Sequence, residues 1–126
     1  MSNFDVVEIK SFVPARDFSL ALAFYQHIGF ELKWNSDDLA YFAAGNASFL
    51  LQNFYEPAHA QNFMMHLLVE RVEAWHTRII DSGALEVFDI QLGAVEDRDW
   101  GMRDFTLRDP SGVLWRIAQN TEPKVS

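Results

Sequence analysis

The chain has 126 residues, of which 49% are hydrophobic and 14% aromatic, enough for one domain with its own core. It contains no cysteine, which excludes disulfides and thiolate metal sites, and its formal net charge of −8 disfavours nucleic acid and anionic membranes as partners while favouring cationic ligands. Without a long apolar run or a basic leader segment, the protein is expected to be cytoplasmic.

The first half of the sequence predicts a strand, a helix and three further strands. Alternating apolar residues favour a strand over residues 6–13. Asp17 is a suitable N-cap for a helix from Phe18 to about Ile28, and Gly29 is its expected stop. Short apolar segments interrupted by polar turns then predict three strands, at residues 30–34, 39–43 and 47–53.

The second half repeats this order. A strand is expected over residues 63–69 and a helix over residues 72–80, with Gly83 as its stop. Gly29 and Gly83 lie 54 positions apart, and the same offset superimposes the apolar faces of the two helices. A unit of this length cannot bury both of its faces alone, so two copies must pack together. The sequence therefore predicts one domain, residues 1–126, built from two βαβββ modules at about 5–55 and 62–120.

Two stretches lack a periodic pattern. Residues 55–62 are interpreted as a polar linker between the modules. Residues 89–99 are interpreted as an irregular loop, and its acidic end, Glu96-Asp97-Arg98-Asp99, as a solvated surface that could attract a cation.

The last part of the chain predicts a β-hairpin. Two apolar runs, at residues 102–107 and 113–117, flank the turn sequence Asp109-Pro110-Ser111-Gly112. Together with Trp100 they form the pattern Trp-Gly-x-Arg-x-Phe-x-Leu-x-Asp-Pro-x-Gly, which resembles the last hairpin of the glyoxalase, bleomycin-resistance and dioxygenase proteins, the vicinal oxygen chelate superfamily. The resemblance implies an α+β fold in which two tandem βαβββ modules form an open, mixed β-sheet half-barrel with helices outside, paired in a dimer.

Catalytic branches of this superfamily hold a divalent ion on the first and last strands of each module. The resemblance places the four ligand positions at Lys10, Phe49, Met64 and Arg116. Family enzymes have histidine, glutamine or glutamate there, whereas this chain has two cations and two apolar side chains, which do not suit a metal ion. We therefore expect no metal, no cofactor and no catalytic residue.

A different strand register does not restore a metal site. Sliding the first strands by two residues offers Glu8 and His66, but the partner strands then supply Leu51 together with Leu114 or Ala118. Two protein ligands are fewer than the three that catalytic sites normally use.

The strand faces that point away from the helices are expected to form a cavity for a small molecule. Trp34 and Trp100 are candidates for its rim, where an indole ring stacks on a planar ligand and attracts a cation. The predicted ligand-binding residues are Glu8, Lys10, Phe12, Trp34, Phe49, Leu51, Met64, His66, Trp100 and Arg116.

Within the superfamily the chain most resembles the bleomycin-resistance branch, whose members lack the metal ligands and bind a drug without altering it. This resemblance extends over Val13-Pro14-Ala15-Arg16-Asp17, from Ala23 to Phe30, and from Asp99 to Gly112. It implies a homodimer whose facing half-barrels enclose two clefts and sequester a planar, cationic, antibiotic-like molecule. Two alternatives remain open: a metal-dependent lyase, isomerase or dioxygenase acting on a small oxygenated substrate, and a module that binds a partner or peptide.

Overall fold

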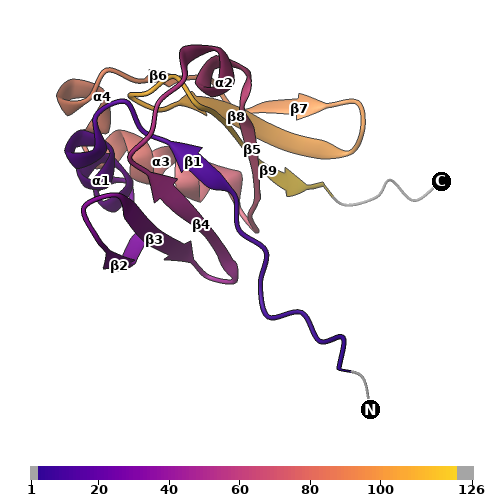
Figure 1. Ribbon diagram of the computed structural model, residues 1–126. Helices are drawn as coiled ribbons and strands as arrows, with labels where there is room; N and C mark the ends of the chain where they lie inside the picture. Colours follow the sequence, from indigo (N-terminus) through magenta and orange to yellow (C-terminus); the bar gives the residue numbers. More distant parts are fainter. Residues whose placement is uncertain (1–2, 122–126) are drawn as a thin grey trace.

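A computed structural model of the protein describes residues 3–121, and its first half forms a four-stranded sheet with one helix (Figure 1). The elements are β1 (Phe12–Pro14), α1 (Phe18–His27), β2 (Glu31–Asn35), β3 (Leu39–Ala44) and β4 (Ala47–Gln52). The strand order is β1-β4-β3-β2, in which β1 runs parallel to β4 and the other neighbours are antiparallel.

The second half forms a five-stranded sheet. Its elements are α2 (Pro57–Asn62), β5 (Met64–Leu68), α3 (Val72–Asp81), α4 (Ala84–Val87), β6 (Gln91–Leu92), β7 (Glu96–Arg98), β8 (Met102–Arg108) and β9 (Leu114–Asn120). The order is β5-β9-β8-β6, and β7 also pairs with β8. Here too the first strand runs parallel to the last, so the predicted α+β fold with two open sheets is confirmed.

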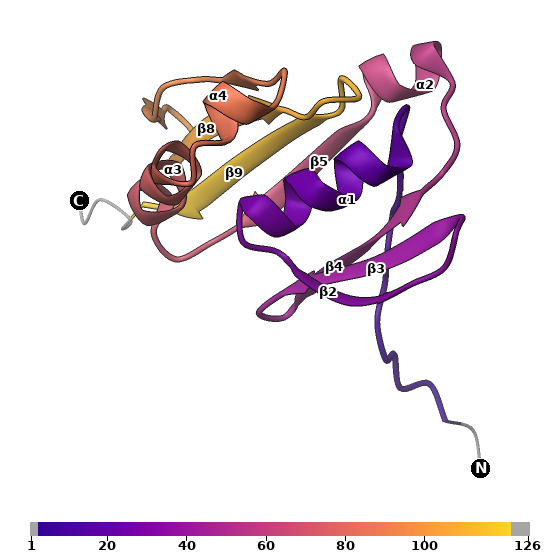
Figure 2. The same ribbon diagram turned by 90° about the vertical axis from the view of Figure 1, so that its left-hand side faces the viewer.

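The two sheets share one core, which lies under the helices. Helices α1 and α3 lie on the same side of the sheets, the side that faces the viewer in Figure 2. From α1, Tyr25 packs its ring against Phe42 and Phe49 of the first sheet and against Trp115 of the second. In the described part of the chain, no helix covers the opposite faces of the two sheets, and we call these the open faces.

Local sequence signals set the helix ends. The Asp17 carboxylate accepts a hydrogen bond from the Leu20 N–H at 3.1 Å, which satisfies a free donor of the first turn of α1. Gly29 and Gly83 follow the ends of α1 and α3 with φ angles of 109° and 79°, which glycine adopts without strain. The helix predictions are confirmed, and α1 and α3 start 54 residues apart.

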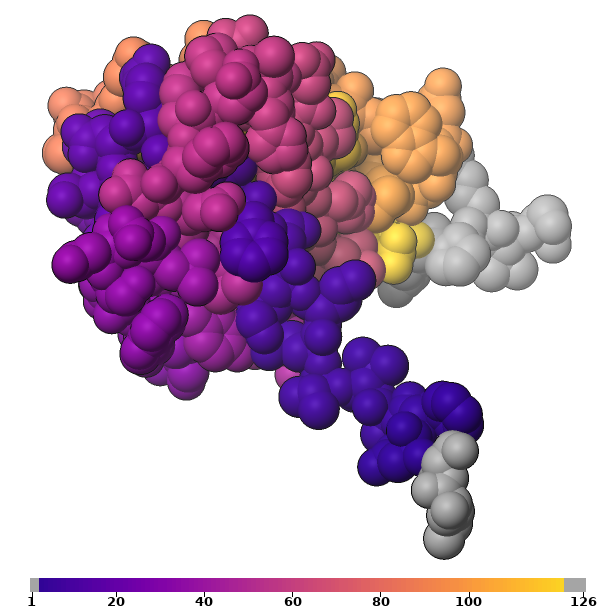
Figure 3. All heavy atoms as spheres, viewed as in Figure 1, coloured from indigo at the N-terminus to yellow at the C-terminus, as the bar shows by residue number. Residues whose placement is uncertain are grey.

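The N-terminal strand is much shorter than predicted. Residues 3–11 have no regular structure, and β1 covers only Phe12–Pro14. Only Phe12–Pro14 pair with β4, opposite Leu50–Gln52, and the preceding residues leave the sheet edge although β4 extends back to Ala47. We call residues 3–11 the N-terminal arm, and its outer part stands away from the body of the molecule (Figure 3).

Four short elements were not predicted. The expected linker contains α2, which begins at Pro57 and is capped by the Glu56 carboxylate, a local signal present in the sequence. The stretch expected to be irregular contains β6 and β7, both held by β8, and α4 follows Gly83. Within residues 3–121, no helix has the length and apolar character needed to span a bilayer.

Candidate functional site

An apolar and aromatic row crosses the open face of the first sheet. Trp34 lies opposite Tyr41, Tyr41 opposite Leu50, and Leu50 opposite Phe12, so the four side chains are neighbours on β2, β3, β4 and β1. Trp34 and Phe12 are 53% and 52% exposed. The structure thus brings two predicted residues, Trp34 and Phe12, together with Tyr41 and Leu50, which the sequence analysis missed.

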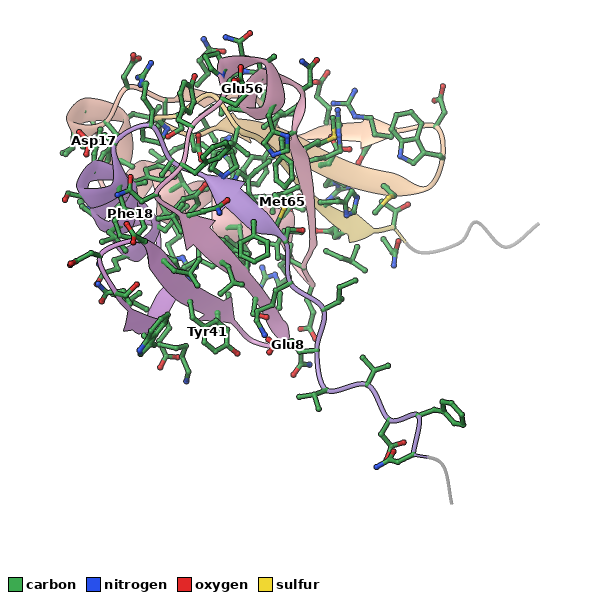
Figure 4. All side chains as sticks on the ribbon, in the orientation of Figure 1. Glu8, Asp17, Phe18, Tyr41, Glu56 and Met65 are labelled. Atoms are coloured by element: carbon green, nitrogen blue, oxygen red, sulfur yellow. The ribbon has the colours of Figure 1, made fainter. Side chains whose placement is uncertain are left out.

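The N-terminal arm passes the sheet beside this row, where Glu8 lies near Tyr41 (Figure 4). The Lys10 ammonium is 2.8 Å from the Glu8 carboxylate and 5.1 Å from the centre of the Tyr41 ring. The Tyr41 hydroxyl donates to the same carboxylate at 3.1 Å, and the Ser48 hydroxyl donates as well. Hydrogen bonds from Lys10 and Ser48 lower the pKa of Glu8 from 4.5 to about 2.

The strand face predicted for Phe49 and Leu51 is wrong. Both side chains are fully buried on the helix side, where Phe49 packs edge-on against Tyr25 and Trp115. The prediction counted residues from the turn glycine of each module, but the turn before β4 contains two residues and the turn before β9 contains five. Because side chains alternate along a strand, this difference puts Leu50, not Phe49, on the open face.

On the open face of the second sheet, His66 of β5 lies opposite Arg116 of β9, which in turn lies opposite Thr106 of β8. Met64 lies two residues from His66 on the same face and is 54% exposed. These three predicted residues, Met64, His66 and Arg116, therefore share one surface. The resemblance placed ligand positions at Met64 and Arg116, and the register pairs Met64 with Leu114 and Arg116 with His66.

A buried carboxylate organises the charges on this second open face. Asp104 of β8 accepts hydrogen bonds from Arg98 Nε at 2.9 Å and from Arg116 Nη1 at 3.0 Å. Its side chain is 1% exposed, whereas the two arginine side chains keep about a quarter of their surface. The sequence analysis missed the contacts of Asp104 with Arg98 and Arg116 because the three residues lie on three different strands.

Trp100 lies in the turn between β7 and β8, away from the aromatic row of the first sheet and from His66 and Arg116 of the second. It is 66% exposed. The Arg98 guanidinium lies 6.0 Å from the centre of its ring. Of the acidic residues that precede it, Glu96 is 3.3 Å from Arg98 and Asp97 is 2.6 Å from Arg103. These two carboxylates are partly neutralised, which reduces their attraction for a distant cation.

A groove of about 830 Å³ runs between the two modules. One wall is the turn between β3 and β4, and the other is formed by the end of β5 and the start of α3. His66 and Leu68 line it, as do Trp75 and Arg78, whose guanidinium stacks 4.2 Å from the centre of the Trp75 ring. The groove reaches the second open face through His66.

The register also shows which side chains occupy the central positions of the open faces. Parallel pairing joins Phe12 to Leu50 in the first sheet and His66 to Arg116 in the second. Of these four, His66 alone carries a group that commonly binds metals. Residues 3–121 contain no group of three histidine, aspartate or glutamate side chains arranged to hold an ion.

Solved structures with the same fold include binding proteins and an enzyme. The bleomycin resistance determinant encoded on transposon Tn5 is 22% identical, with a TM-score of 0.77 over 91% of this chain and 98% of that chain. The bleomycin-binding protein of bleomycin-producing Streptomyces verticillus, solved with copper(II)-bleomycin, is 19% identical, with a TM-score of 0.74 over 98% and 100%. Lactoylglutathione lyase from Agrobacterium tumefaciens is also 19% identical, with a TM-score of 0.65 over 91% and 95%.

At these identities the likeness concerns the fold. No curated protein matches the chain in sequence. The sequence profile of one family, however, matches residues 6–117, which is most of the chain. The protein therefore belongs to the Glyoxalase/Bleomycin resistance protein/Dioxygenase superfamily.

Proposed function

We propose that the protein binds and sequesters a small, planar, antibiotic-like molecule without a metal or other cofactor, in a cleft between the two subunits of a homodimer. The observation that carries this proposal is the aromatic row on the open face of the first sheet. The solved bleomycin-binding proteins with this fold, one complexed with bleomycin and one with copper(II)-bleomycin, support it. A cysteine-free chain suits the reducing cytoplasm, where we propose that the protein acts.

The row supports a planar ligand because of its composition and exposure. Trp34, Tyr41 and Phe12 present rings on the same face, and half of the Trp34 and Phe12 surface is uncovered. Aromatic rings bury a large area at a small cost in side-chain entropy, and they stack on flat ligands. A site made by these side chains would recognise the flat shape of a ligand more than its pattern of hydrogen-bonding groups.

The dimer follows from the apolar surface that one chain leaves open. On the N-terminal arm, Phe4, Val7 and Ile9 are 88%, 98% and 90% exposed, and Met64 and Leu68 of the second open face are also exposed. A large amount of exposed apolar surface favours an interaction with a partner. A second copy related by two-fold symmetry would cover both open faces, so each cleft would be formed by one sheet from each subunit.

We propose a cationic ligand on the basis of the net charge of −8. The attraction would act at long range, because a negative protein raises the local concentration of a positive ligand and speeds its association. Glu96 and Asp97 contribute less to this attraction than the sequence analysis assumed, since both form ion pairs. The ligand contacts themselves would be apolar and aromatic.

Binding without a metal is favoured by the side chains of the open faces. Lys10 and Arg116 are cations, and Arg116 is held by Asp104 instead of facing an ion. The competing function is a metal-dependent lyase, isomerase or dioxygenase, for which the lactoylglutathione lyase fold is a precedent. That function would need two or more ligands besides His66.

A thermal-shift screen with two arms tests the proposal. The first arm contains bleomycin and other planar cationic antibiotics, each with a neutral planar analogue. The second contains zinc, nickel, manganese and iron(II), with and without EDTA. A ligand present at about a hundred times its dissociation constant adds about 2.7 kcal/mol of stability, which raises the melting temperature of a domain of this size by roughly ten degrees.

We expect stabilisation in the first arm and none in the second. A metal that binds at one ion per subunit and is removed by EDTA with a fall in melting temperature would favour the enzyme instead. If neutral analogues stabilised the protein as much as the cationic compounds, the proposed binding function would stand, but the proposed preference for a cationic ligand would be wrong.

A further inference from the structure

A second, smaller pocket lies near α2 and the turn at residues 109–112. Figure 2 shows α2 at the end of the molecule opposite the N-terminal arm. Its volume is about 210 Å³. The entrance to α1, helix α2, strand β6 and the turn all contribute to its wall, with Arg16, Gln61, Gln91 and Arg108 as the long polar side chains. None of the predicted ligand-binding residues lines this pocket.

Two arginines from opposite ends of the sequence are fixed at the same turn. Arg16 Nη2 donates to the Pro110 carbonyl at 3.1 Å, and Arg108 Nη1 donates to the Gly112 carbonyl at 2.8 Å. The Arg16 guanidinium also lies 5.9 Å from the centre of the Tyr55 ring. Because a guanidinium carries five N–H donors, both groups keep most of their donors for another partner.

The charge of these two arginines is not balanced by direct ion pairs. Among residues 3–121, Arg98, Arg103 and Arg116 each have a carboxylate within 4.0 Å, whereas Arg16 and Arg108 have none, and Arg71 and Arg78 at the larger groove have none either. At the small pocket, Arg16 and Arg108 therefore present two guanidinium groups without a carboxylate partner in a chain with a net charge of −8.

The carboxylates that line the pocket do not neutralise these arginines. Asp109 is buried and accepts hydrogen bonds from the Tyr25 hydroxyl and from the N–H groups of Ser111 and Val113. Asp89 lines the pocket but is exposed and forms no ion pair within the described chain. The positive side of the pocket is therefore free to take an external anion.

We propose that this pocket binds a small oxyanion, the phosphate or carboxylate group of a metabolite, between Arg16 and Arg108. Planar guanidinium groups match the geometry of oxyanions and form their strongest, charge-assisted hydrogen bonds with them. The volume is several times the roughly 30 Å³ that a water molecule occupies, so the oxyanion fits together with a small attached body. This site is separate from the proposed antibiotic cleft, and either can fail without the other.

Phosphate binding to the full chain is the first test. Calorimetric titration with sodium phosphate, at ionic strength held constant with sodium chloride, should give saturable binding of one anion per chain. Amide NMR signals of Ser111 and Gly112 and the Nε–H signals of Arg16 and Arg108 should shift with the same saturation curve. The proposal would be overturned if binding did not saturate up to about 10 mM phosphate, because the dissociation constant would then exceed the millimolar range. NMR shifts confined to other residues would overturn it as well.

Variants test the two arginines against a matched arginine elsewhere. Arg16→Gln and Arg108→Gln should each weaken phosphate binding by about tenfold or more, the usual effect of losing a charge-assisted hydrogen bond. Arg103→Gln removes the same charge from β8, where it pairs with Asp97 and Glu73, and should bind phosphate like the wild type. If all three variants lost the same affinity for phosphate, the effect would come from the overall charge of the protein, and the proposed site would be wrong.

Asp89→Asn gives a test in the opposite direction. Removal of this carboxylate from the pocket should tighten phosphate binding, whereas a site for a cation would be weakened by the same change. Citrate, acetate and a phosphate monoester such as ribose 5-phosphate then distinguish the sources of the oxyanion. Ribose 5-phosphate should bind more tightly than inorganic phosphate if the rest of the pocket accommodates its sugar. Citrate binding more tightly than both would assign the pocket to carboxylates.

Discussion

The Tyr25 hydroxyl donates a hydrogen bond to the carboxylate of Asp109, and this contact joins the first helix to the last hairpin, 84 residues away in the sequence. The same hydroxyl accepts a hydrogen bond from Trp115 Nε1 at 2.9 Å. All three side chains are buried, and Tyr25 also packs against aromatic rings of both sheets. A single side chain thus satisfies polar groups of the second module while filling the core of the first.

Tyr25→Phe should lower the free energy of unfolding by about 2–4 kcal/mol, because it retains the ring but leaves the buried Asp109 carboxylate and Trp115 N–H without this partner. Urea denaturation followed by fluorescence measures the loss. Tyr41→Phe is the matched control, since its hydroxyl donates to Glu8 on the surface, and it should cost less than about 1 kcal/mol. Similar losses in both variants would contradict the role assigned to Tyr25.

Alkaline pH should destabilise the protein through the same residue. Burial, and secondarily the Asp109 charge, raise the pKa of Tyr25 well above its ordinary value of 10.0. The folded state therefore keeps a proton that the unfolded state releases, so the free energy of unfolding falls as pH rises above about 10. Absorbance at 295 nm should show one tyrosine that ionises only with unfolding, and Tyr25→Phe should lack this step. Ionisation of all three tyrosines without unfolding would contradict the prediction.

Val7→Glu should weaken the proposed dimer. Val7 is 98% exposed on the arm, and burial of such a side chain contributes roughly 1.5–3 kcal/mol, so its replacement by a charge should raise the dimer dissociation constant by tenfold or more. Sedimentation equilibrium measures this constant. Val87→Glu alters a 64% exposed valine on α4 and should leave the dimer unchanged. If the wild-type chain remained monomeric at micromolar concentration, both the proposed dimer and the proposed cleft between subunits would be wrong.

Trp100→Ala should reduce affinity for a ligand found in the screen by about 1–3 kcal/mol, at low and high salt alike, if the indole stacks on that ligand. Calorimetric titration with the ligand measures the change. Phe54→Ala removes an aromatic ring of similar exposure, 56%, from outside the predicted site, and should bind normally. Unchanged affinity in Trp100→Ala would exclude Trp100 from the site.

Elements with local signals were predictable from the sequence. The ends of α1 and α3 followed from Asp17, Gly29 and Gly83, because a cap or a left-handed glycine acts within a few residues of itself. The last hairpin followed from the turn at Asp109-Pro110-Ser111-Gly112. Phe12 reached the open face as expected because it alternates with the buried Val13, whereas Trp34 reached it through a register shift in β2 between Leu32 and Trp34.

The sequence by itself determined two similar modules, their helices and an open fold of a known family, because these depend on periodicity and on residues close in the chain. Tertiary structure decided which face of β4 is buried, since hairpin loops of different lengths change the phase of the following strand. It also decided that Asp104 holds Arg98 and Arg116, and that Arg16 meets Arg108 at one turn. Such contacts join residues on different strands or in different modules, so their geometry exists only after the sheets have paired and packed.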